Sequence, residues 1–316
     1  MLLEVTNLTT EFTSPDGLPL RAVEGLSFSL ARGQALGVVG ESGCGKTTAM
    51  LSLLRLLPAG GRVVAGEVLF DGVDLLRISP AELRERRWRD LAVVFQGAMN
   101  ALNPVRTIGD QIREALIVHE SLPRERATAR VAELLELVEI PAWRAQQFPH
   151  QYSGGMRQRA MIAMALACEP QLIIADEPTT ALDVMIQAQI MELLDRLRRE
   201  LNLALIIVTH DLGIVAESCQ QVLVMYGGRA AEYGAVKQIF SAPRHPHTQR
   251  LLGAFPDIDQ PDAPLLGIPG APPRLANLPS GCRFHPRCLL AEERCRIECP
   301  ELRQVATAQW AACHLV

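Results

Sequence analysis

The chain has 316 residues; 48% of them are apolar, and 31 basic against 35 acidic residues leave a formal net charge of −4. This length allows one large domain or two modest ones, and the apolar content excludes a disordered chain. The balanced charge gives no support for a nucleic-acid-binding surface.

The chain carries no pattern typical of a membrane span or a secretion signal. Its longest uncharged apolar stretches, such as residues 160–168 and 203–208, fall well short of the roughly twenty residues that a spanning helix needs. The N-terminus lacks the basic start and the following apolar segment of a signal peptide. We therefore expect the protein to be made and kept in the cytoplasm.

The first forty residues have the pattern of β-structure. Residues 2–12 and 18–30 alternate partly between apolar and polar side chains on either side of a turn at 14–17, which predicts a β-hairpin. A short apolar strand at 34–39 then leads directly into a glycine-rich loop and a helix that begins at Lys46.

The glycine-rich loop has the sequence of a phosphate-binding loop. Residues 40–47 read Gly-Glu-Ser-Gly-Cys-Gly-Lys-Thr and fit G-x-x-x-x-G-K-[ST]. Glycines let backbone N–H groups curl around phosphates, and the following helix N-terminus adds further donors. Lys46 can reach the β- and γ-phosphates, and the Thr47 hydroxyl can coordinate Mg²⁺. The strand before and the helix after disfavour a chance turn, so the segment predicts a site for ATP and Mg²⁺.

Residues 98–150 differ from their surroundings. They are rich in Arg and Glu, and residues 130–140 have the amphipathic spacing of a helix. We interpret the segment up to about residue 160 as an inserted helical subdomain. From about 154 to 230, helical segments alternate with short apolar runs that are typical of parallel strands covered on both faces. The predicted fold class is α/β.

A second small-residue loop follows the helical segment. Ser153, Gly154 and Gly155 precede a helix rich in Ala and Met, and a loop that caps a helix N-terminus is a second phosphate-binding surface. One chain rarely needs two such surfaces for one γ-phosphate, whereas two chains packed head to tail need both. The pattern therefore favours a head-to-tail dimer in which each chain caps the nucleotide of the other.

Carboxylates follow the apolar strand at 172–176. Asp176 and Glu177 would lie at the ligand crevice of an α/β sheet, where Asp176 holds Mg²⁺ through water and Glu177 polarises the attacking water. His210, at the end of the next apolar strand, is expected to contact the γ-phosphate. Taken alone, two acids after an apolar run mark a plain strand end as often as they mark a functional site. A lone histidine is usually structural. The phosphate loop favours the functional interpretation.

In their order, these motifs resemble those of the ATPase subunit of ABC transporters over residues 1 to about 250. The resemblance implies a P-loop ATPase core with an N-terminal antiparallel β subdomain and a helical subdomain at about 98–160. It implies that Gln96, in the Q-loop, is a catalytic contact and a Mg²⁺ ligand, and that residues 181–183 form the D-loop. Met156 departs from the more usual glutamine. The implied nucleotide contacts are Gly40, Ser42, Gly43, Gly45, Lys46, Thr47, Thr48, Ser153, Gly154, Gly155, Asp176 and Asp183.

Phe12 is our candidate for the aromatic side chain that stacks on adenine. A core residue of the hairpin is nearly as good an interpretation of this position.

Several stretches resemble the dipeptide and oligopeptide importer ATPases in particular: residues 152–184, 225–234, 244–252 and 269–288. This resemblance implies a second, similar ATPase subunit, two membrane permease subunits and a periplasmic or lipid-anchored solute-binding protein, at the cytoplasmic face of the cell membrane. Related importers carry nickel, oligosaccharides or opines, and these remain alternative cargoes for this chain. A non-transport ABC ATPase acting on DNA or ribosomes is disfavoured, because the chain is not basic and lacks both a long coiled-coil insertion and a second ATPase unit.

Prolines become frequent after about residue 243, and we interpret residues 251–316 as a separate, irregular C-terminal module. In a reducing compartment its crowded cysteines favour a metal site over disulfides. Four thiolates suit either Zn²⁺ or a [4Fe–4S] cluster, while the spacing matches no tight zinc ribbon, and a tail without metal stays open. The subfamily resemblance implies an iron–sulfur cluster on Cys282, Cys288, Cys295 and Cys313.

Other ligands compete for such a site. Cys299 is an alternative fourth ligand, and zinc would also accept His285 or His314. Any metal there is expected to act as a structural staple, since an irregular tail of this size has little core of its own.

Overall fold

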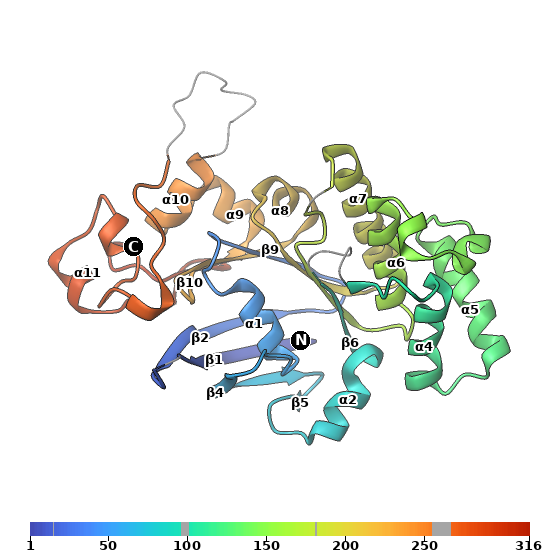
Figure 1. The fold of residues 1–316 in the computed structure, drawn as a ribbon. Coiled ribbons are helices and arrows are strands. Elements are labelled where there is room, and N and C mark those ends of the chain that lie inside the picture. The colour runs from blue at the N-terminus through green and yellow to red at the C-terminus, as the bar shows by residue number, and fades with distance from the viewer. Residues whose placement is uncertain (15, 96–100, 181, 255–266) are drawn as a thin grey trace. The chain divides into compact units, whose positions relative to one another are not determined.

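The computed structural model describes residues 1–14, 16–95, 101–180, 182–254 and 267–316 (Figure 1). Contacts divide the chain into two compact units. Unit 1 comprises Met1–Ala31, Ala35–Arg77 and Thr209–Val316, and unit 2 comprises Arg32–Gln34 and Ile78–Val208. Within the described ranges, no helix is both long enough and apolar enough to cross a membrane.

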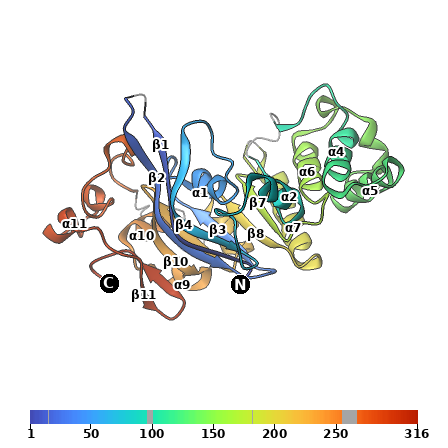
Figure 2. The ribbon, with the colours of Figure 1, turned by 90° about the horizontal axis from the view of Figure 1, so that it is seen from below.

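Unit 1 opens with an antiparallel sheet in the order β2-β1-β4-β5. The predicted hairpin is confirmed, since β1 pairs with β2 from Leu3 opposite Leu30 to Thr13 opposite Pro19. Figure 2 shows β1, β2 and β4 side by side. The bounds are Leu3–Thr13 for β1, Pro19–Leu30 for β2, Gly61–Phe70 for β4 and Val73–Asp74 for β5.

A second set of strands in unit 1 joins distant parts of the chain. β3 (Ala35–Val39) pairs in parallel with β9 (Gln221–Tyr226), which pairs antiparallel with β10 (Arg229–Ala235). Two strands of the C-terminal tail, β12 (Gln309–Ala311) and β11 (Arg303–Ala306), continue this sheet from β10. The tail is therefore not irregular throughout, a point its proline-rich composition did not indicate.

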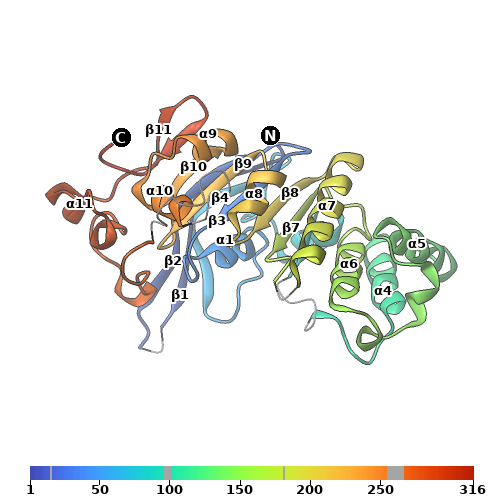
Figure 3. The same cartoon turned by 90° about the horizontal axis from the view of Figure 1, so that it is seen from above.

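The helices of unit 1 are short. In Figure 3, α8 and α9 lie over these strands, and α8 packs on β3 while α9 packs on β9 and β10. Helix α1 begins at Lys46, as the sequence predicts. The bounds are Lys46–Leu53 for α1, Leu212–Ser218 for α8, Val236–Ser241 for α9, Pro246–Gly253 for α10 and Glu293–Ile297 for α11, with 3-10 turns η3 at Leu275–Asn277 and η4 at His285–Arg287.

Unit 2 contains three parallel strands in the order β8-β7-β6. Every residue of β7 (Leu172–Asp176) and β8 (Ala204–Val208) is buried, as expected for parallel strands covered on both faces. The third strand, β6, spans Leu91–Val94. Together with the helices of this unit, these strands confirm the predicted α/β class.

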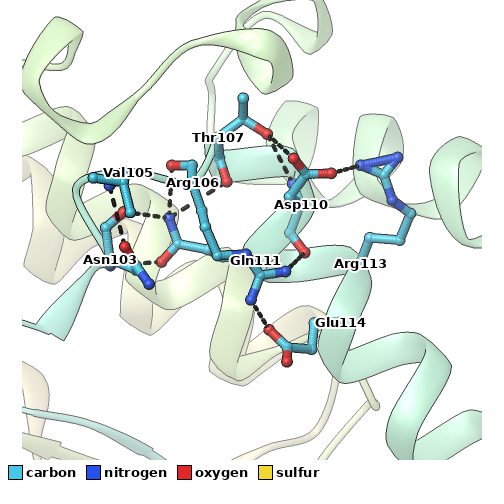
Figure 4. A network of polar contacts seen from close by, with 8 residues as sticks. All are labelled: Asn103, Val105, Arg106, Thr107, Asp110, Gln111, Arg113 and Glu114. Atoms are coloured by element: carbon cyan, nitrogen blue, oxygen red, sulfur yellow. Dashed lines mark hydrogen bonds and ion pairs between the residues drawn. The ribbon is translucent and has the colours of Figure 1, made fainter.

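Helices dominate the segment predicted to be an inserted subdomain. Helices α4, α5 and α6 lie side by side (Figure 1). Figure 4 shows how α4 is anchored: the amide nitrogen of Gln111, a buried residue, donates to the main-chain oxygens of Asn103 and Arg106, both at 3.1 Å. The bounds are Pro80–Arg89 for α2, Ile108–Glu120 for α4, Arg124–Leu137 for α5, Gly154–Ala165 for α6 and Val184–Glu200 for α7, with 3-10 turns η1 at Ala142–Gln146 and η2 at Pro149–Gln151.

Candidate nucleotide-binding site

The predicted phosphate loop connects the end of β3 to α1 in unit 1. Lys46 is 7% exposed, and its Nζ donates to the main-chain oxygens of Gly40 at 2.7 Å and Glu41 at 3.2 Å. The ammonium group is thus folded back over its own loop. Ser42, Gly43 and Thr47 are exposed, and Thr48 is half-buried. The loop therefore offers hydroxyl and backbone groups to a ligand around one buried cation.

Two glycines of the loop stand where no other residue fits. Gly40 has a φ of 148°, and a Cβ there would come within 2.2 Å of the Met225 carbonyl oxygen. Gly45 has a φ of 98°, and its Cβ would lie 2.5 Å from the Ala22 carbonyl oxygen. Left-handed backbone and close contact with neighbouring main chain both require glycine. The pattern G-x-x-x-x-G thus has a packing cause in this fold as well as a chemical one.

Phe12 lies half-buried on β1, opposite Leu20 of β2 and Gly61 of β4. Its ring lies so close to the backbone of Gly61 that a Cβ there would be 2.7 Å from a ring carbon. The ring is partly engaged in packing of the β subdomain and partly accessible. Adenine stacking by Phe12 stays a prediction.

The acidic residues lie at the end of β7 in unit 2. Asp176 is buried, and Glu177 follows it half-buried with a φ of 46°. Left-handed backbone at a non-glycine residue is unfavourable and persists where the surrounding structure enforces it, often at functional positions. Here the Glu177 N–H donates to the Val208 carbonyl oxygen at 2.8 Å, and its Oε2 accepts from the Thr180 hydroxyl at 2.9 Å. The carboxylate is held in a fixed direction.

His210 belongs to unit 1 and is exposed. The next residue, Asp211, caps α8, because its carboxylate accepts from the Gly213 N–H at 2.8 Å. The phosphate loop and His210 lie in unit 1, whereas Asp176 and Glu177 lie in unit 2. Their convergence into one site therefore stays a prediction.

The second small-residue loop caps α6, as predicted. Ser153 Oγ accepts from the Met156 N–H at 3.3 Å. Gly155 is buried, and a Cβ at this residue would lie 2.7 Å from the Ile186 side chain, so the start of α6 packs closely on α7. Asp183 caps α7 by accepting from the Ile186 N–H at 3.0 Å. The two capped helix starts form one compact surface that exposes Ser153 and Asp183.

Gln96, in the predicted Q-loop, and Ala181, the first residue of the predicted D-loop, lie outside the described residues. The structure therefore gives no placement for either.

The predicted metal ligands in the tail lie near one another. Burial raises the pKa of the Cys282 thiol to about 11, and the other three predicted ligands act on it in the same direction. Cys282 N–H also donates to the Cys295 carbonyl oxygen at 2.8 Å, whereas Cys299 is exposed. Among the residues that the structure describes, however, no three His, Cys, Asp or Glu side chains are arranged to hold a metal ion. The iron–sulfur prediction is therefore not confirmed.

A polar cluster that the sequence did not indicate lies beside the phosphate loop. Glu41 Oε1 accepts from Arg287 Nη1 at 2.7 Å and lies 3.3 Å from His247 Nε2. Both partners come from the stretches that resemble peptide-importer ATPases, 244–252 and 269–288. That resemblance was the only available signal, because no local pattern pairs residues so far apart in the chain.

Comparison with known proteins decides the family. A family model described as ABC transporter matches residues 23–180, and one described as oligopeptide/dipeptide transporter, C-terminal region, matches residues 231–295. The chain belongs to the ABC transporter family. As a member, it is an ATP-hydrolysing subunit with the ABC ATPase fold, which confirms the fold and the enzyme class predicted from the motifs.

Relatives match along nearly the whole chain. The oligopeptide transport ATP-binding protein OppD of Haemophilus influenzae is 47% identical, with 99% of this chain and 97% of that protein covered. The dipeptide transport ATP-binding protein DppD of Escherichia coli is 46% identical, with 99% and 96% covered.

Among solved structures, the dimeric ATP-binding cassette MJ0796 bound to ADP and phosphate is 27% identical with a TM-score of 0.67, covering 74% of this chain and 98% of that chain. The cbiO1 subunit of the Clostridium perfringens complex cbiONQ is 30% identical with a TM-score of 0.65, covering 76% and 91%.

Proposed function

We propose that this ATPase powers the import of di- and oligopeptides. The observation that carries the proposal is the joint match of residues 23–180 to the ABC transporter family and of residues 231–295 to the C-terminal region of oligopeptide/dipeptide transporters. Identity of 46–47% to OppD and DppD proteins over nearly the full length supports the same cargo class.

At the site, the backbone of the phosphate loop and Lys46 bind the β- and γ-phosphates. Thr47, Gln96 and Asp176, the last through water, hold Mg²⁺. Glu177 polarises the attacking water, and His210 contacts the γ-phosphate. Catalysis of this kind depends on positioning and on charge stabilisation, without a covalent intermediate. The fixed direction of the Glu177 carboxylate and the buried Lys46 cation support these assignments.

The working unit is a head-to-tail pair with a similar but distinct ATPase. The loop from Ser153 to Gly155 of one subunit caps the nucleotide that the phosphate loop of the other holds, and closure of the pair drives two membrane permease subunits. A solute-binding protein delivers the peptide, and the ATPase works at the cytoplasmic face of the membrane. The exposed cap at Ser153 and the dimeric form of the related MJ0796 cassette support this arrangement.

For the tail we propose a structural metal site, a [4Fe–4S] cluster with zinc as the alternative, on Cys282, Cys288, Cys295 and Cys313. The proposal is supported by the proximity of these buried and half-buried thiols, since the other three each raise the pKa of Cys282. Their described positions do not have the geometry of metal ligands. The test measures iron, sulfide and zinc per chain after anaerobic purification. Loss of the metal in Cys282→Ser but not in the exposed Cys299→Ser would support this site, and metal-free wild-type protein would contradict it.

The cargo is tested with the complete complex reconstituted in vesicles. Labelled di- and oligopeptides are delivered by the cognate binding protein, and ATP-dependent uptake is followed with wild-type and Lys46→Ala complexes. Uptake that depends on Lys46 establishes a peptide importer. Vigorous ATP hydrolysis without peptide accumulation would contradict the proposal of peptide cargo. The same uptake assay would then be repeated with nickel, oligosaccharides and opines.

A further inference from the structure

The C-terminal tail contacts the phosphate loop directly. Arg287, at the end of η4, donates from Nη1 to Glu41 Oε1 at 2.7 Å. Glu41 is the second residue of the phosphate loop, 246 positions away in the chain. The side chains of Arg287 and Glu41 are 7% and 17% exposed. A pair buried to this degree is little screened by solvent, so its charges matter more than those of a surface ion pair.

Arg287 is held in place by its other contacts. Its Nε donates to the Pro269 carbonyl oxygen at 2.6 Å, and Nη1 also contacts the Tyr226 hydroxyl at 3.2 Å. The guanidinium lies over the Tyr226 ring, 5.8 Å from its centroid. A planar fork fixed on several sides loses little side-chain entropy when it binds a carboxylate. The contact with Glu41 is thus preorganised.

A second arginine of the tail joins the same region. Arg283 contacts the Glu24 carboxylate and the Gly227 carbonyl oxygen, and its side chain is 9% exposed. The neighbouring Gly228 N–H donates to the carbonyl oxygen of Cys44, within the phosphate loop, at 2.9 Å. The tail therefore contacts this region at two points. Arg287 contacts Glu41 in the phosphate loop, and Arg283 contacts Gly227, next to the glycine that donates to the loop.

Glu41 carries a charge that needs a partner. Burial by itself raises the pKa of its carboxyl group, but the nearby His247 ring and the hydrogen bond from Arg287 outweigh burial and lower that pKa, so the group is ionised at neutral pH. His247 is fully buried, and burial lowers its pKa, which leaves it neutral there. Arg287 is thus the cation that balances Glu41. The main-chain oxygen of Glu41 also accepts from Lys46, so one residue connects Arg287 with the proposed phosphate-binding lysine.

We propose that Arg287 is a positioning residue for ATP: it neutralises Glu41 and fixes the phosphate loop, so that the C-terminal tail sets the affinity of the site for nucleotide. The inference rests on the proposed role of the loop in binding phosphates. Without Arg287, an unbalanced carboxylate in this loop repels the negative charges of ATP, and the carbonyl group that orients Lys46 loses its support.

The test compares Arg287→Met with Arg294→Met in the full chain. Arg294 forms an exposed ion pair with Glu298 at 2.7 Å in the same tail, with side chains 60% and 56% exposed, and is the matched control. Binding of a fluorescent ATP analogue gives Kd, and turnover gives KM and kcat. We expect Arg287→Met to raise Kd and KM about tenfold, or about 1.4 kcal/mol, with a much smaller change in kcat. Arg294→Met should change Kd and KM by no more than about twofold.

Rescue separates charge balance from simple loss of folding. Arg287→Met combined with Glu41→Gln removes both charges and should recover most of the lost affinity, whereas a misfolded tail would not be repaired by a change in the loop. Arg287→Lys keeps the charge without the fork and should give an intermediate Kd. Wild-type affinity in Arg287→Met, or no rescue by Glu41→Gln, overturns the inference.

Lys46→Ala distinguishes this inference from the function on which it rests. If Lys46→Ala abolishes nucleotide binding while Arg287→Met leaves it unchanged, only the role of Arg287 is wrong. If Lys46→Ala leaves nucleotide affinity unchanged, the proposed role of the loop itself is wrong.

Discussion

The ammonium group of Lys46 lies 2.7 Å from the carbonyl oxygen of Gly40, and both residues are buried. This contact joins the first residue of α1 to the first residue of the phosphate loop, so the loop closes on itself around a positive charge. A buried cation at this place attracts negatively charged phosphate groups that enter the loop.

Substitution of Lys46 by Ala should weaken ATP binding by about 10- to 150-fold, because a hydrogen bond to a charged group contributes about 1.5–3 kcal/mol. Thermal stability should change little beyond the loss of two contacts to main-chain oxygens. Binding of a fluorescent nucleotide measures the effect. Unchanged affinity would contradict the placement of the β- and γ-phosphates at Lys46.

Glu177→Gln should retain ATP binding and lose hydrolysis. The amide keeps the size of the side chain and can still accept from the Thr180 hydroxyl, but it is a far weaker base. Loss of a general base typically lowers turnover by about 10²–10⁴-fold. Phosphate release under saturating ATP, compared with the Kd for ATP, separates the two steps. A Gln variant that turns over at the normal rate would remove Glu177 from the mechanism.

Ser153→Ala separates a helix cap from a nucleotide contact when it is compared with Thr107→Ala. Thr107 caps α4, and its hydroxyl lies between the Asp110 N–H at 3.2 Å and the Asp110 carboxylate at 2.8 Å (Figure 4). Each substitution should cost about 1 kcal/mol of unfolding free energy. Only Ser153→Ala should also lower turnover, by about tenfold or more. This is the effect expected from the loss of one hydrogen bond to a charged phosphate group. Equal turnover in the two variants would leave Ser153 as a cap alone.

Gly40→Ala should prevent the phosphate loop from forming. The added Cβ would meet the Met225 carbonyl oxygen at 2.2 Å, and a backbone oxygen cannot move aside as a flexible side chain can. We expect a loss of about 1–3 kcal/mol or more in the free energy of unfolding, together with loss of ATP binding. Denaturant unfolding measures the first and nucleotide titration the second. Gly267→Ala is the control, because nothing lies within 4 Å of a Cβ there and its backbone is not left-handed.

Acid should destabilise the protein through His245. Burial lowers the pKa of this fully buried histidine from its usual 6.5 to about 3, and neighbouring His247 acts in the same direction. Between pH 6.5 and 3 the unfolded chain binds a proton at this residue and the folded chain does not. The free energy of unfolding therefore falls with decreasing pH across this window, by up to about 1.4 kcal/mol per pH unit from this group.

Urea unfolding between pH 7 and pH 4.5 tests this dependence in His245→Asn. In the wild-type protein, His245 Nδ1 accepts from the main-chain N–H of His247 at 3.0 Å. The Asn side chain can accept the same hydrogen bond, but it does not titrate. The variant should lose stability at pH 7 and show a shallower decrease on acidification. His150→Asn, at an exposed position, should keep the wild-type slope. An unchanged slope in His245→Asn would assign the acid sensitivity to other groups.

Much of the fold and of the candidate site follows from local sequence. The run from β3 into the loop and α1, the strand that ends at Asp176, and the cap at Ser153 were all predicted, because each depends on residues within a few positions of one another. Apolar runs with no polar interruption identified β7 and β8 because strands covered on both faces have no solvent side.

The caps of α7 and α8 were not predicted. Asp183 was expected only as a nucleotide contact, but its carboxylate and that of Asp211 accept from main-chain N–H groups at the helix starts, a role that becomes visible only when the helix ends are placed. The strands β11 and β12 were likewise missed, since they are short and gain their pairing from β10.

The sequence by itself determined the chemistry of this protein: a phosphate loop, strand-end acids and a second glycine-rich cap, each encoded by close spacing because the backbone conformations involved depend on adjacent residues. Only the tertiary structure decided that Arg287 meets Glu41 across 246 positions. Such a pair is selected by the packing of Tyr226 and η4 around it and by the energetic need to balance a buried carboxylate, and neither cause is present in a short stretch of chain.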